Sequence, residues 1–477
     1  MRRLVHSGFT LFTVLSVVSL LVAAAPATAA PPRCLGRAAT IVGTNGNDTL
    51  RGTNGADVIV GLRGRDRILG RGGNDRICAG AGAQSFDEET GERFREFSSG
   101  GGGADRIAGG RGPDHVVGGP GDDRLNSGPG SFESLEGNAG NDALDGGPGF
   151  AEDARFLTSQ GPVVASLADG AATGEGTDRF RNLDELMGSS HDDTLTGDLG
   201  DPEAFAGLYG HAGDDTLIGG AESNFLWGGP GDDDIDGGDG FDFLDHVHLN
   251  RLVGLPSDAV TVNLVTGTVA GQGTDTIRNV EGADGTPGDD SFIGNDEANE
   301  FTQMFEGDDT VDAGAGDDLV DGGDGTDDLD GGEGQDLLGH LDHSVAVTVD
   351  LQARTSTGTE TDQIDNFEDV LGSFENDEIS GDSSANVLMG APGDDTLMGL
   401  AGDDTLIGEG FGFHHDEDDG TDSADGGPGT DACDAETEVA CEGDPPPEQA
   451  LARRVPAVTA WEGTKPSALL MYWSRPR

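Results

Sequence analysis

Aspartate recurs at a nine-residue spacing through most of the 477-residue chain, and glycine precedes it at fixed positions. Four such units fill residues 43–78 without a gap, as GTNGNDTLR, GTNGADVIV, GLRGRDRIL and GRGGNDRIC. The template has glycine at positions 1 and 4, often glycine at position 2, aspartate at position 6 and an apolar residue at position 8. Carboxylate and turn carbonyl oxygens are hard ligands, which suit Ca²⁺ better than softer metals. The pattern therefore predicts a row of calcium sites.

The same nine residues predict the element that would position each aspartate. Glycine allows positive φ, so the first part of a unit is expected to form a tight turn. The apolar residue at position 8 predicts a short strand with one buried face. A single unit cannot bury that face, whereas stacked units can, so the period favours a solenoid.

Two units in each coil would place residues 18 apart directly above one another. The predicted pairs include Asp48 over Asp66, Asp57 over Asp75, Asp215 over Asp233, Asp309 over Asp327, and Asp318 over Asp336. Stacked carboxylates repel one another at short range, so the stack requires a cation between them. The alternative is that each aspartate only caps its own turn. Glycine and aspartate stay in phase over roughly two dozen units, which favours the cation.

The candidate calcium ligands are the position-6 aspartates. They are Asp48, Asp57, Asp66, Asp75, Asp105, Asp114, Asp123, Asp142, Asp215, Asp233, Asp242, Asp309, Asp318, Asp327, Asp336, Asp395 and Asp404. Asparagine replaces aspartate at Asn224, Asn299 and Asn386, where an oxygen remains but a charge is lost. We expect weaker binding at those three units.

The units GGRGPDHVV (109–117), GGPGDDRLN (118–126), GGPGDDDID (228–236) and GGDGTDDLD (322–330) resemble the RTX, or haemolysin-type, calcium-binding nonapeptide. The resemblance covers most of residues 43–434. It implies an all-β fold, the parallel β-roll (a β-solenoid). It also implies multiple Ca²⁺ ions, held in the turns by the position-6 aspartates and by backbone carbonyls.

A longer repeat of 37 residues interrupts the nonapeptides at 162–198, 259–295 and 346–382. The three long blocks share Val163/Val260/Val347, Leu167/Leu264/Leu351, Gly174/Gly271/Gly358, Thr177/Thr274/Thr361, Asp178/Asp275/Asp362, Asn182/Asn279/Asn366, Gly188/Gly285/Gly372, Asp193/Asp290/Asp377 and Gly197/Gly294/Gly381. The segment AVTVNL (259–264) alternates as a strand does. We expect each block to form a longer strand pair that extends the solenoid; the alternative is a separate ligand-binding module.

The two ends of the chain differ from the body. Arg2 and Arg3, an apolar stretch over residues 11–25 and the A-x-A motif at 27–29 predict a signal peptide. The alternative is an uncleaved membrane anchor, for which the apolar run is short. The chain divides into a signal peptide (1–30), N-terminal repeats (31–145), three segments of long block plus repeats (146–245, 246–339 and 340–442) and a disordered basic tail (443–477). We expect a secreted, extracellular protein with no transmembrane segment after cleavage.

The cysteines are Cys34, Cys78, Cys433 and Cys441. An even count in an exported chain favours disulfides over free thiols. Local pairs, Cys34–Cys78 and Cys433–Cys441, would clamp the two ends of the body, although the sequence leaves the connectivity open.

Composition narrows the function further. Asp and Glu number 91 against 26 Lys and Arg, which gives a net charge of −65 and makes nucleic acid an unsuitable partner. Such a charge, with 34% hydrophobic residues, normally keeps a chain disordered unless the acid is neutralised. The chain contains no H-E-x-x-H and no G-x-S-x-G, and its single lysine, Lys465, lies near the end. We therefore expect no enzyme.

Histidine offers weaker candidates for metal binding. His414, His415 and Asp416 lie in the segment 411–425, which, like 83–98, breaks the period and is expected to form a surface loop. His246 and His248, like His340 and His343, are pairs that lack a third ligand.

The sequence thus predicts an exported calcium-binding repeat protein that folds on binding several calcium ions and has a structural or surface role. One alternative is a calcium-dependent adhesin or matrix protein, with cell-surface or matrix polymers as partners. The other is a secreted hydrolase or toxin that uses the interruptions.

Overall fold

The computed structural model describes residues 31–81, 96–149, 151–197, 205–221, 223–246, 259–341, 343–408, 422–435 and 437–441. These residues form the strands β1 to β45 and contain no helix. No helix of these ranges is therefore long and apolar enough to cross a membrane. The predicted signal peptide, the tail 443–477, His248, His414, His415, Asp416 and most of the two predicted loops lie outside the described residues.

Two sheets run along the whole body, and each regular coil contributes one strand to each sheet. The first, named the outer sheet, consists of β3 (Ile41–Val42), β5 (Val58–Arg63), β7 (Arg76–Ala81), β9 (Arg106–Arg111), β11 (Arg124–Asn126), β13 (Ala143–Asp145), β15 (Val164–Ser166), β16 (Ala171–Thr173), β17 (Thr177–Arg181), β19 (Thr194–Thr196), β21 (Thr216–Gly220), β23 (Asp234–Gly238), β25 (Thr261–Asn263), β26 (Thr268–Ala270), β27 (Thr274–Arg278), β29 (Ser291–Ile293), β31 (Thr310–Asp312), β33 (Asp328–Asp330), β35 (Thr348–Asp350), β36 (Thr355–Thr357), β37 (Thr361–Asp365), β39 (Glu378–Ser380), β41 (Thr396–Met398), β43 (Ser423–Asp425) and β45 (Thr437–Val439).

The second, named the inner sheet, is entirely parallel. It consists of β4 (Thr49–Arg51), β6 (Arg67–Gly72), β8 (Glu96–Gly102), β10 (Asp114–Val117), β12 (Ser134–Glu136), β14 (Asp153–Arg155), β18 (Glu185–Met187), β20 (Phe205–Tyr209), β22 (Ser223–Trp227), β24 (Phe243–Leu244), β28 (Gly282–Asp284), β30 (Glu300–Thr302), β32 (Leu319–Val320), β34 (Leu337–Gly339), β38 (Asp369–Leu371), β40 (Val387–Met389), β42 (Thr405–Ile407) and β44 (Ala432–Asp434). Its first strand, β4, pairs with β6, and its last strand, β44, pairs with β42. Since β4 and β44 do not pair with each other, this sheet is open among the described strands.

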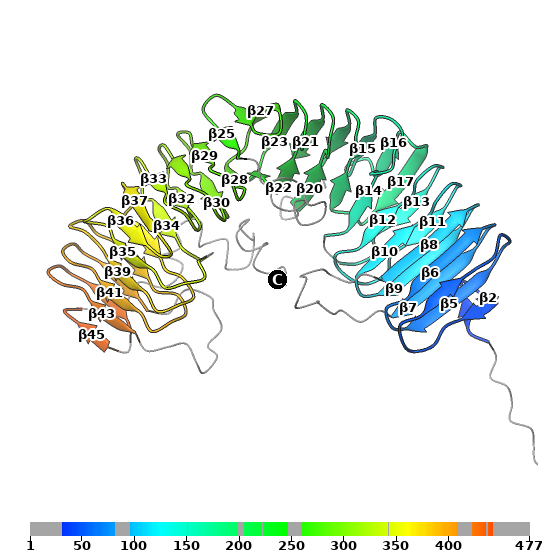
Figure 1. Ribbon diagram of the computed structural model, residues 1–477, viewed down its shortest axis with the longest axis horizontal. Helices are drawn as coiled ribbons and strands as arrows, with labels where there is room; N and C mark the ends of the chain where they lie inside the picture. Colours follow the sequence, from blue (N-terminus) through cyan, green and yellow to red (C-terminus); the bar gives the residue numbers. More distant parts are fainter. Residues whose placement is uncertain are drawn as a thin grey trace, which may run out of the picture.

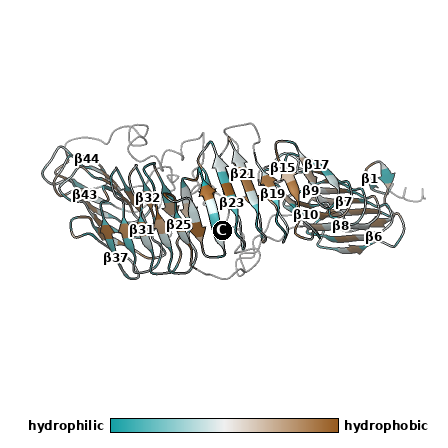
Figure 2. Ribbon diagram, turned by 90° about the horizontal axis from the view of Figure 1, so that it is seen from above, coloured by the Kyte–Doolittle hydropathy of each residue, from teal (hydrophilic) through white to brown (hydrophobic). Residues whose placement is uncertain are grey.

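The apolar residues at position 8 fill the space between the two sheets. Ile59 lies opposite Ile77, and Ile77 lies opposite Ile107, in successive strands of the outer sheet. These side chains and those of the inner sheet form one continuous buried cluster from Ile59 to Cys433. Apolar residues follow the strands while polar residues follow the turns (Figure 2). Each fully buried Leu or Ile contributes roughly 1.5–3 kcal/mol, so a thin core can hold the coils together. The predicted all-β parallel β-roll is confirmed.

Each long block begins with three strands of the outer sheet, where a strand pair was predicted. In the first block β15, β16 and β17 form an antiparallel meander within the outer sheet. Strand β17 pairs with β13 of the preceding coil, and β15 pairs with β19 of the following coil. The inner sheet meanwhile passes directly from β14 to β18. The roll is therefore continuous through the block, and the outer sheet gains two strands that the inner sheet lacks.

The asparagine shared by the blocks fixes the end of each meander. Asn182, Asn279 and Asn366 have φ values of 52, 53 and 59°, which asparagine tolerates better than most residues. In each case Nδ2 donates to the position-9 carboxylate on the outer-sheet strand of the preceding coil: Asn182 to Asp145 at 2.8 Å, Asn279 to Asp236 at 2.7 Å, and Asn366 to Asp330 at 2.6 Å. One side chain thus joins each block to the coil before it.

The additional strands explain the shape of the molecule. The body is an arch (Figure 1). In its middle, β20, β22, β28 and β30 of the inner sheet lie on the concave side, and β21, β23, β25 and β27 of the outer sheet lie on the convex side. Strands lie about 4.8 Å apart and packed sheets about 10 Å apart, so two extra strands in one sheet open a wedge of roughly 50°. Three blocks would together turn the roll by roughly 150°. The blocks therefore act as corner pieces.

Deleting residues 344–360 should remove one corner. The deletion removes β35 and β36 and joins residues 340–343 to 361–365. These nine residues then form one unit of nonapeptide length that contains β37 and follows β34. We expect the remaining strands to stack in parallel and the arch to open, so that the maximum dimension in small-angle X-ray scattering increases although the chain is shorter. Deleting residues 313–330, two complete nonapeptides, is the matched control and should shorten the arch without opening it. An unchanged or smaller dimension in the first variant would contradict the wedge.

Candidate calcium-binding turns

The position-6 carboxylates form ladders along the turns. In each step Oδ1 accepts a hydrogen bond from the backbone N–H of the position-6 residue one coil earlier. The five predicted stacks all take this form: Asp48 N–H to Asp66 at 2.9 Å, Asp57 to Asp75 at 2.7 Å, Asp215 to Asp233 at 2.7 Å, Asp309 to Asp327 at 2.8 Å, and Asp318 to Asp336 at 2.9 Å. The 18-residue coil is therefore confirmed.

The other predicted site residues lie in the same ladders. The further steps are Asp75 to Asp105, Asp105 to Asp123, Asp123 to Asp142, Asp114 to Glu133, Asn224 to Asp242, Asp395 to Asp422, and Asp404 to Asp431. Asp75 and Asp105 are 30 residues apart, so the insertion between them leaves the ladder intact.

Sequence reasoning missed several members of the ladders. Glu133 accepts from the backbone N–H of Asp114 at 2.9 Å. It lies 19 residues after Asp114, because its unit is one residue longer than the nonapeptide, so the strict period would have placed Phe132 there instead. Glu281 and Glu368 belong to the long blocks and accept from the backbone N–H groups of Asp242 and Asp336 at 2.8 and 3.1 Å. Their ladder position follows from the three-strand meander, which the sequence did not reveal.

A second oxygen of most ladder aspartates has no hydrogen-bond donor. The residues with a buried, unpaired Oδ2 are Asp66, Asp75, Asp105, Asp114, Asp123, Asp142, Asp215, Asp233, Asp309, Asp318, Asp327, Asp336, Asp395 and Asp404. Each of these residues is at most 3% exposed. A buried carboxylate oxygen without a donor is costly unless a cation or a proton satisfies it.

Burial also changes the acidity of these carboxyls. Desolvation raises the pKa of Asp123 to about 7 and that of Asp233 to about 8. The backbone N–H bond to each carboxylate lowers its pKa, but neighbouring ladder carboxylates raise it again. Asp114, which faces Glu133, has its pKa raised by burial to about 9. Without a cation, the ladder favours protonated carboxyls.

Glycine at position 1 creates the space for the second oxygen. A Cβ on Gly228 would lie 2.0 Å from Asp233 Oδ2, and one on Gly118 would lie 2.4 Å from Asp123 Oδ2. Glycine at position 4 similarly lets turn carbonyls approach, because a Cβ on Gly231 would lie 1.8 Å from the Gly213 oxygen. Carboxylate and carbonyl oxygens of adjacent coils therefore crowd together in the turns.

These donors fit calcium. Within the described ranges, no three His, Cys, Asp or Glu side chains gather closely enough to hold a metal ion. A cation in the turns would thus depend on carboxylate Oδ2 atoms together with main-chain carbonyls. All are hard oxygens, which Ca²⁺ accepts in flexible numbers and geometry, whereas zinc and copper favour nitrogen or sulfur.

Position 5 forms a second, exposed ladder that sequence reasoning also missed. Asp214 Oδ1 accepts from the Asp232 N–H at 3.1 Å, and Asp308 Oδ1 accepts from the Thr326 N–H at 3.2 Å. The repeated Asp-Asp pair was its signal. Because these carboxylates face solvent, water can hydrate them, and they do not need a cation as the buried position-6 oxygens do.

The buried histidines bind protein groups. His340 Nε2 lies 2.8 Å from Ser356 Oγ, and its Nδ1 lies 3.3 Å from the Leu371 carbonyl. Burial lowers the pKa of His340 to about 3, so the ring is neutral. His246 Nδ1 lies 2.8 Å from the Asp284 carbonyl. These contacts hold both rings in place.

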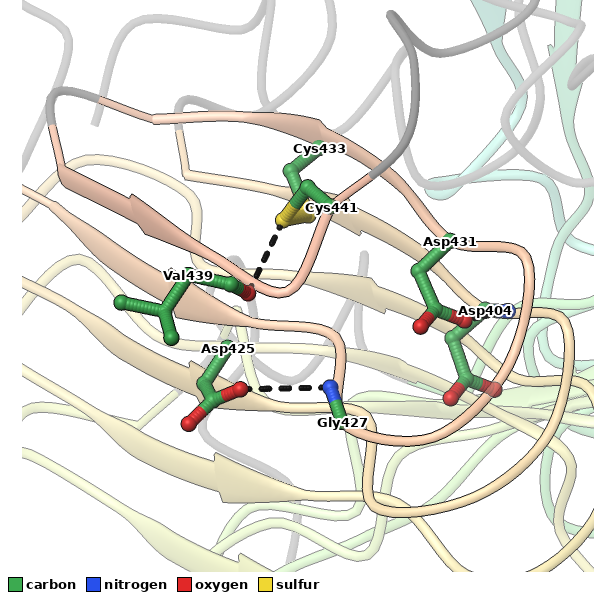
Figure 3. The surroundings of a disulfide bond; sticks show 7 residues. All are labelled: Asp404, Asp425, Gly427, Asp431, Cys433, Val439 and Cys441. Atoms are coloured by element: carbon green, nitrogen blue, oxygen red, sulfur yellow. Dashed lines mark hydrogen bonds between the residues drawn. A yellow bond between two sulfur atoms is a disulfide. The ribbon is translucent and has the colours of Figure 1, made fainter.

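Disulfides close both ends of the described roll, as predicted. Cys34 on β1 (Arg33–Cys34), which pairs with β2 (Arg37–Ala38), is bonded to Cys78 on β7 with a Cα–Cα distance of 5.6 Å. Cys433 is bonded to Cys441 with a Cα–Cα distance of 5.9 Å. This second disulfide lies near the last ladder step, in which the Asp404 N–H donates to Asp431 (Figure 3). Each crosslink opposes fraying of a terminal coil.

Glycine-rich turns, short parallel strands and buried carboxylate ladders define a parallel β-roll of nonapeptide repeats. The family model of the RTX calcium-binding nonapeptide repeat (4 copies) matches residues 36–68, 51–83, 99–131, 133–150, 184–202, 209–244, 305–338 and 371–406. The chain therefore contains multiple copies of the RTX calcium-binding nonapeptide repeat. The gaps between matches contain most of each long block. A search of curated proteins found no match.

The raised pKa values predict that acid stabilises the metal-free roll. Asp123, Asp215 and Asp318 have pKa values near 7 in the folded chain, mainly because they are buried. Carboxyl groups of an unfolded chain have pKa values of about 4. Stability from these groups is therefore fully present below about pH 4 and is lost as the pH rises through about 7. Circular dichroism in EDTA should show more β structure at pH 4.5 than at pH 8. A metal-free chain that loses β structure on acidification would contradict the predicted direction.

Proposed function

We propose that this protein is an exported, non-catalytic calcium-binding repeat protein that folds when several calcium ions bind in its turns. The observation that carries the proposal is the row of buried Oδ2 atoms without donors. Each lies within a turn whose glycines let neighbouring oxygens approach. A divalent ion bound there supplies the positive charge that the ladder lacks.

The chain's own residues explain why folding would depend on the ion. At neutral pH the carboxylates of Asp215, Asp233 and their ladder neighbours repel one another, and burial removes the water that would screen them. The strands contribute as few as two or three residues each, so the core cannot offset many buried charges. Binding energy would then become folding energy.

Export and a structural role fit the remaining features. The N-terminal residues have the pattern of a signal peptide, and both cysteine pairs form disulfides, which persist in oxidising compartments. Extracellular calcium modules work at about 10⁻⁴–10⁻³ M. Repeats cover the body that a catalytic domain would otherwise occupy.

The test uses residues 31–443 after treatment with EDTA. Ca²⁺ is then added in steps, and far-UV circular dichroism is measured at each step. We expect a cooperative gain of β signal at sub-millimolar to millimolar Ca²⁺, because the ion neutralises many turns of one continuous stack. Mg²⁺ is the control and should fail, since it demands stricter octahedral geometry. Full β structure in EDTA at pH 8 would refute calcium-coupled folding.

A calcium-dependent adhesin or matrix protein is a second candidate. The arch places three similar blocks along one convex side, which would allow multivalent contact (Figure 1). The second block forms most of a groove of about 420 Å³, lined by residues that include Val265, Arg278, Asn279, Glu281 and Glu297. Its polar lining suits a hydroxylated surface polymer.

Pull-down on cells or matrix polysaccharide tests the adhesin. We expect retention that requires calcium and falls by at least tenfold when Arg278 and Asn279 are both changed to alanine. Changing Arg124 and Asn126, on a regular strand of the outer sheet, is the matched control. Absence of binding at every calcium concentration would eliminate this candidate.

A further inference from the structure

Most nonapeptide turns fall into two classes that differ at position 2. In the first class, named open turns, the position-2 residue has positive φ, as at Gly229 (97°), Gly323 (74°) and even His211 (89°) and Leu400 (69°). Its N–H donates to a group other than the position-6 carboxylate: the N–H of Gly101 donates to the Gly118 oxygen at 2.9 Å, and that of Gly323 donates to Asp321 Oδ1 at 3.2 Å. The N–H is thus unavailable to the carboxylate. All the unpaired, buried Oδ2 atoms named above belong to open turns.

In the second class, named capped turns, position 2 is serine or threonine. These residues are Thr44, Thr53, Ser189, Thr286 and Ser373, and none of them has positive φ. Each donates its backbone N–H to the Oδ2 of its own position-6 aspartate: Thr44 to Asp48 at 2.5 Å, Thr53 to Asp57 at 2.6 Å, Ser189 to Asp193 at 2.5 Å, Thr286 to Asp290 at 2.6 Å and Ser373 to Asp377 at 2.6 Å.

The hydroxyl group adds a further donor to the same carboxylate. Its distance to the nearer carboxylate oxygen is 2.9 Å for Thr44, 2.9 Å for Thr53, 3.1 Å for Ser189, 3.0 Å for Thr286 and 2.9 Å for Ser373. In the three long blocks, Oδ1 is also bonded, because Val163, Val260 and Val347 donate their N–H groups at 2.7, 2.6 and 2.7 Å. The carboxylates of the capped turns have no unpaired buried oxygen.

Capped turns occupy particular places in the roll. Asp48 and Asp57 begin the first run of repeats, and Asp193, Asp290 and Asp377 lie near the ends of the three blocks, where the repeats resume. In the blocks, the residue one coil earlier is a valine of the meander instead of a turn aspartate. Asn299 and Asn386, the next units after two of these turns, are satisfied similarly by the N–H groups of Asn295 and Asp382, at 2.8 and 2.9 Å.

We propose that serine or threonine at position 2 replaces calcium, so that open turns bind the ion and capped turns do not. The inference rests on the proposed function and assigns it turn by turn. Hydrogen bonds to a charged acceptor are stronger than neutral ones, so several such donors can satisfy a buried carboxylate without a cation. An open turn leaves one of the two oxygens unsatisfied. Asp48 and Asp57, two of the ligands predicted from sequence, would then bind no calcium, and each run would begin on metal-independent turns.

Two triple variants of the full chain test the assignment. Asp193→Asn, Asp290→Asn and Asp377→Asn change one capped turn in each run. Asp215→Asn, Asp309→Asn and Asp395→Asn change the next residue of the same three ladders, each in an open turn. We expect equilibrium dialysis with Ca²⁺ to show the wild-type number of bound ions for the capped triple and at least three fewer for the open triple. Equal losses in both would overturn the assignment.

A third variant guards against misfolding of the capped triple. Ser189→Ala, Thr286→Ala and Ser373→Ala remove only the hydroxyl groups. We expect an unchanged number of bound ions, together with faster amide exchange of residues 285–290 in EDTA. Loss of about three ions would mean that these hydroxyls are calcium ligands, which would overturn the proposal. A wild-type chain that binds no calcium would instead refute the proposed function, and the inference with it.

Discussion

A buried carboxylate in each turn is the constraint on which the structure depends. One oxygen of Asp233 is bonded to the coil before it, at 2.7 Å, and so helps to hold the stack together. The other oxygen of the same group is buried without a donor and would push the stack apart once it is ionised. The same carboxylate therefore both stabilises the stack, through its bonded oxygen, and destabilises it, through its unpaired oxygen. Protons, a cation or additional donors must resolve that conflict.

The two sheets translate local pairing into overall shape. Regular coils add one strand to each sheet, so a run of nonapeptides is nearly straight. A block adds two strands to the outer sheet only, and the inner sheet continues undisturbed from β24 to β28. Curvature therefore arises from strand number and needs no special backbone geometry in the inner sheet. The arch follows from where the blocks stand in the chain.

The sequence predicted the coil, the disulfides and most ladder positions because each depends on a strict period or on proximity in the chain. Asp57 over Asp75 required only that two units make one coil. The meander was missed because β16 (Ala171–Thr173) consists of small residues with no clear alternation. The two turn classes were missed because threonine in GTNGAD and leucine in GLRGRD look like equivalent departures from glycine. The positive φ of Leu62, and the bonds from the Thr53 N–H and hydroxyl to Asp57, separate them.

Three of the five capped turns stand at the corners of the arch, and their position there has a physical cause. At a corner the meander adds strands between two regular coils, so Asp193, Asp290 and Asp377 accept from a valine N–H instead of from the N–H of another turn aspartate. A cation there would lack the carbonyls of an earlier turn, whereas a serine or threonine needs only its own N–H and hydroxyl. The sequence therefore places side-chain donors where the stack cannot supply cation ligands. Corners held by hydrogen bonds would alternate with straight runs held by ions, and the loss of ions would loosen the runs before the corners.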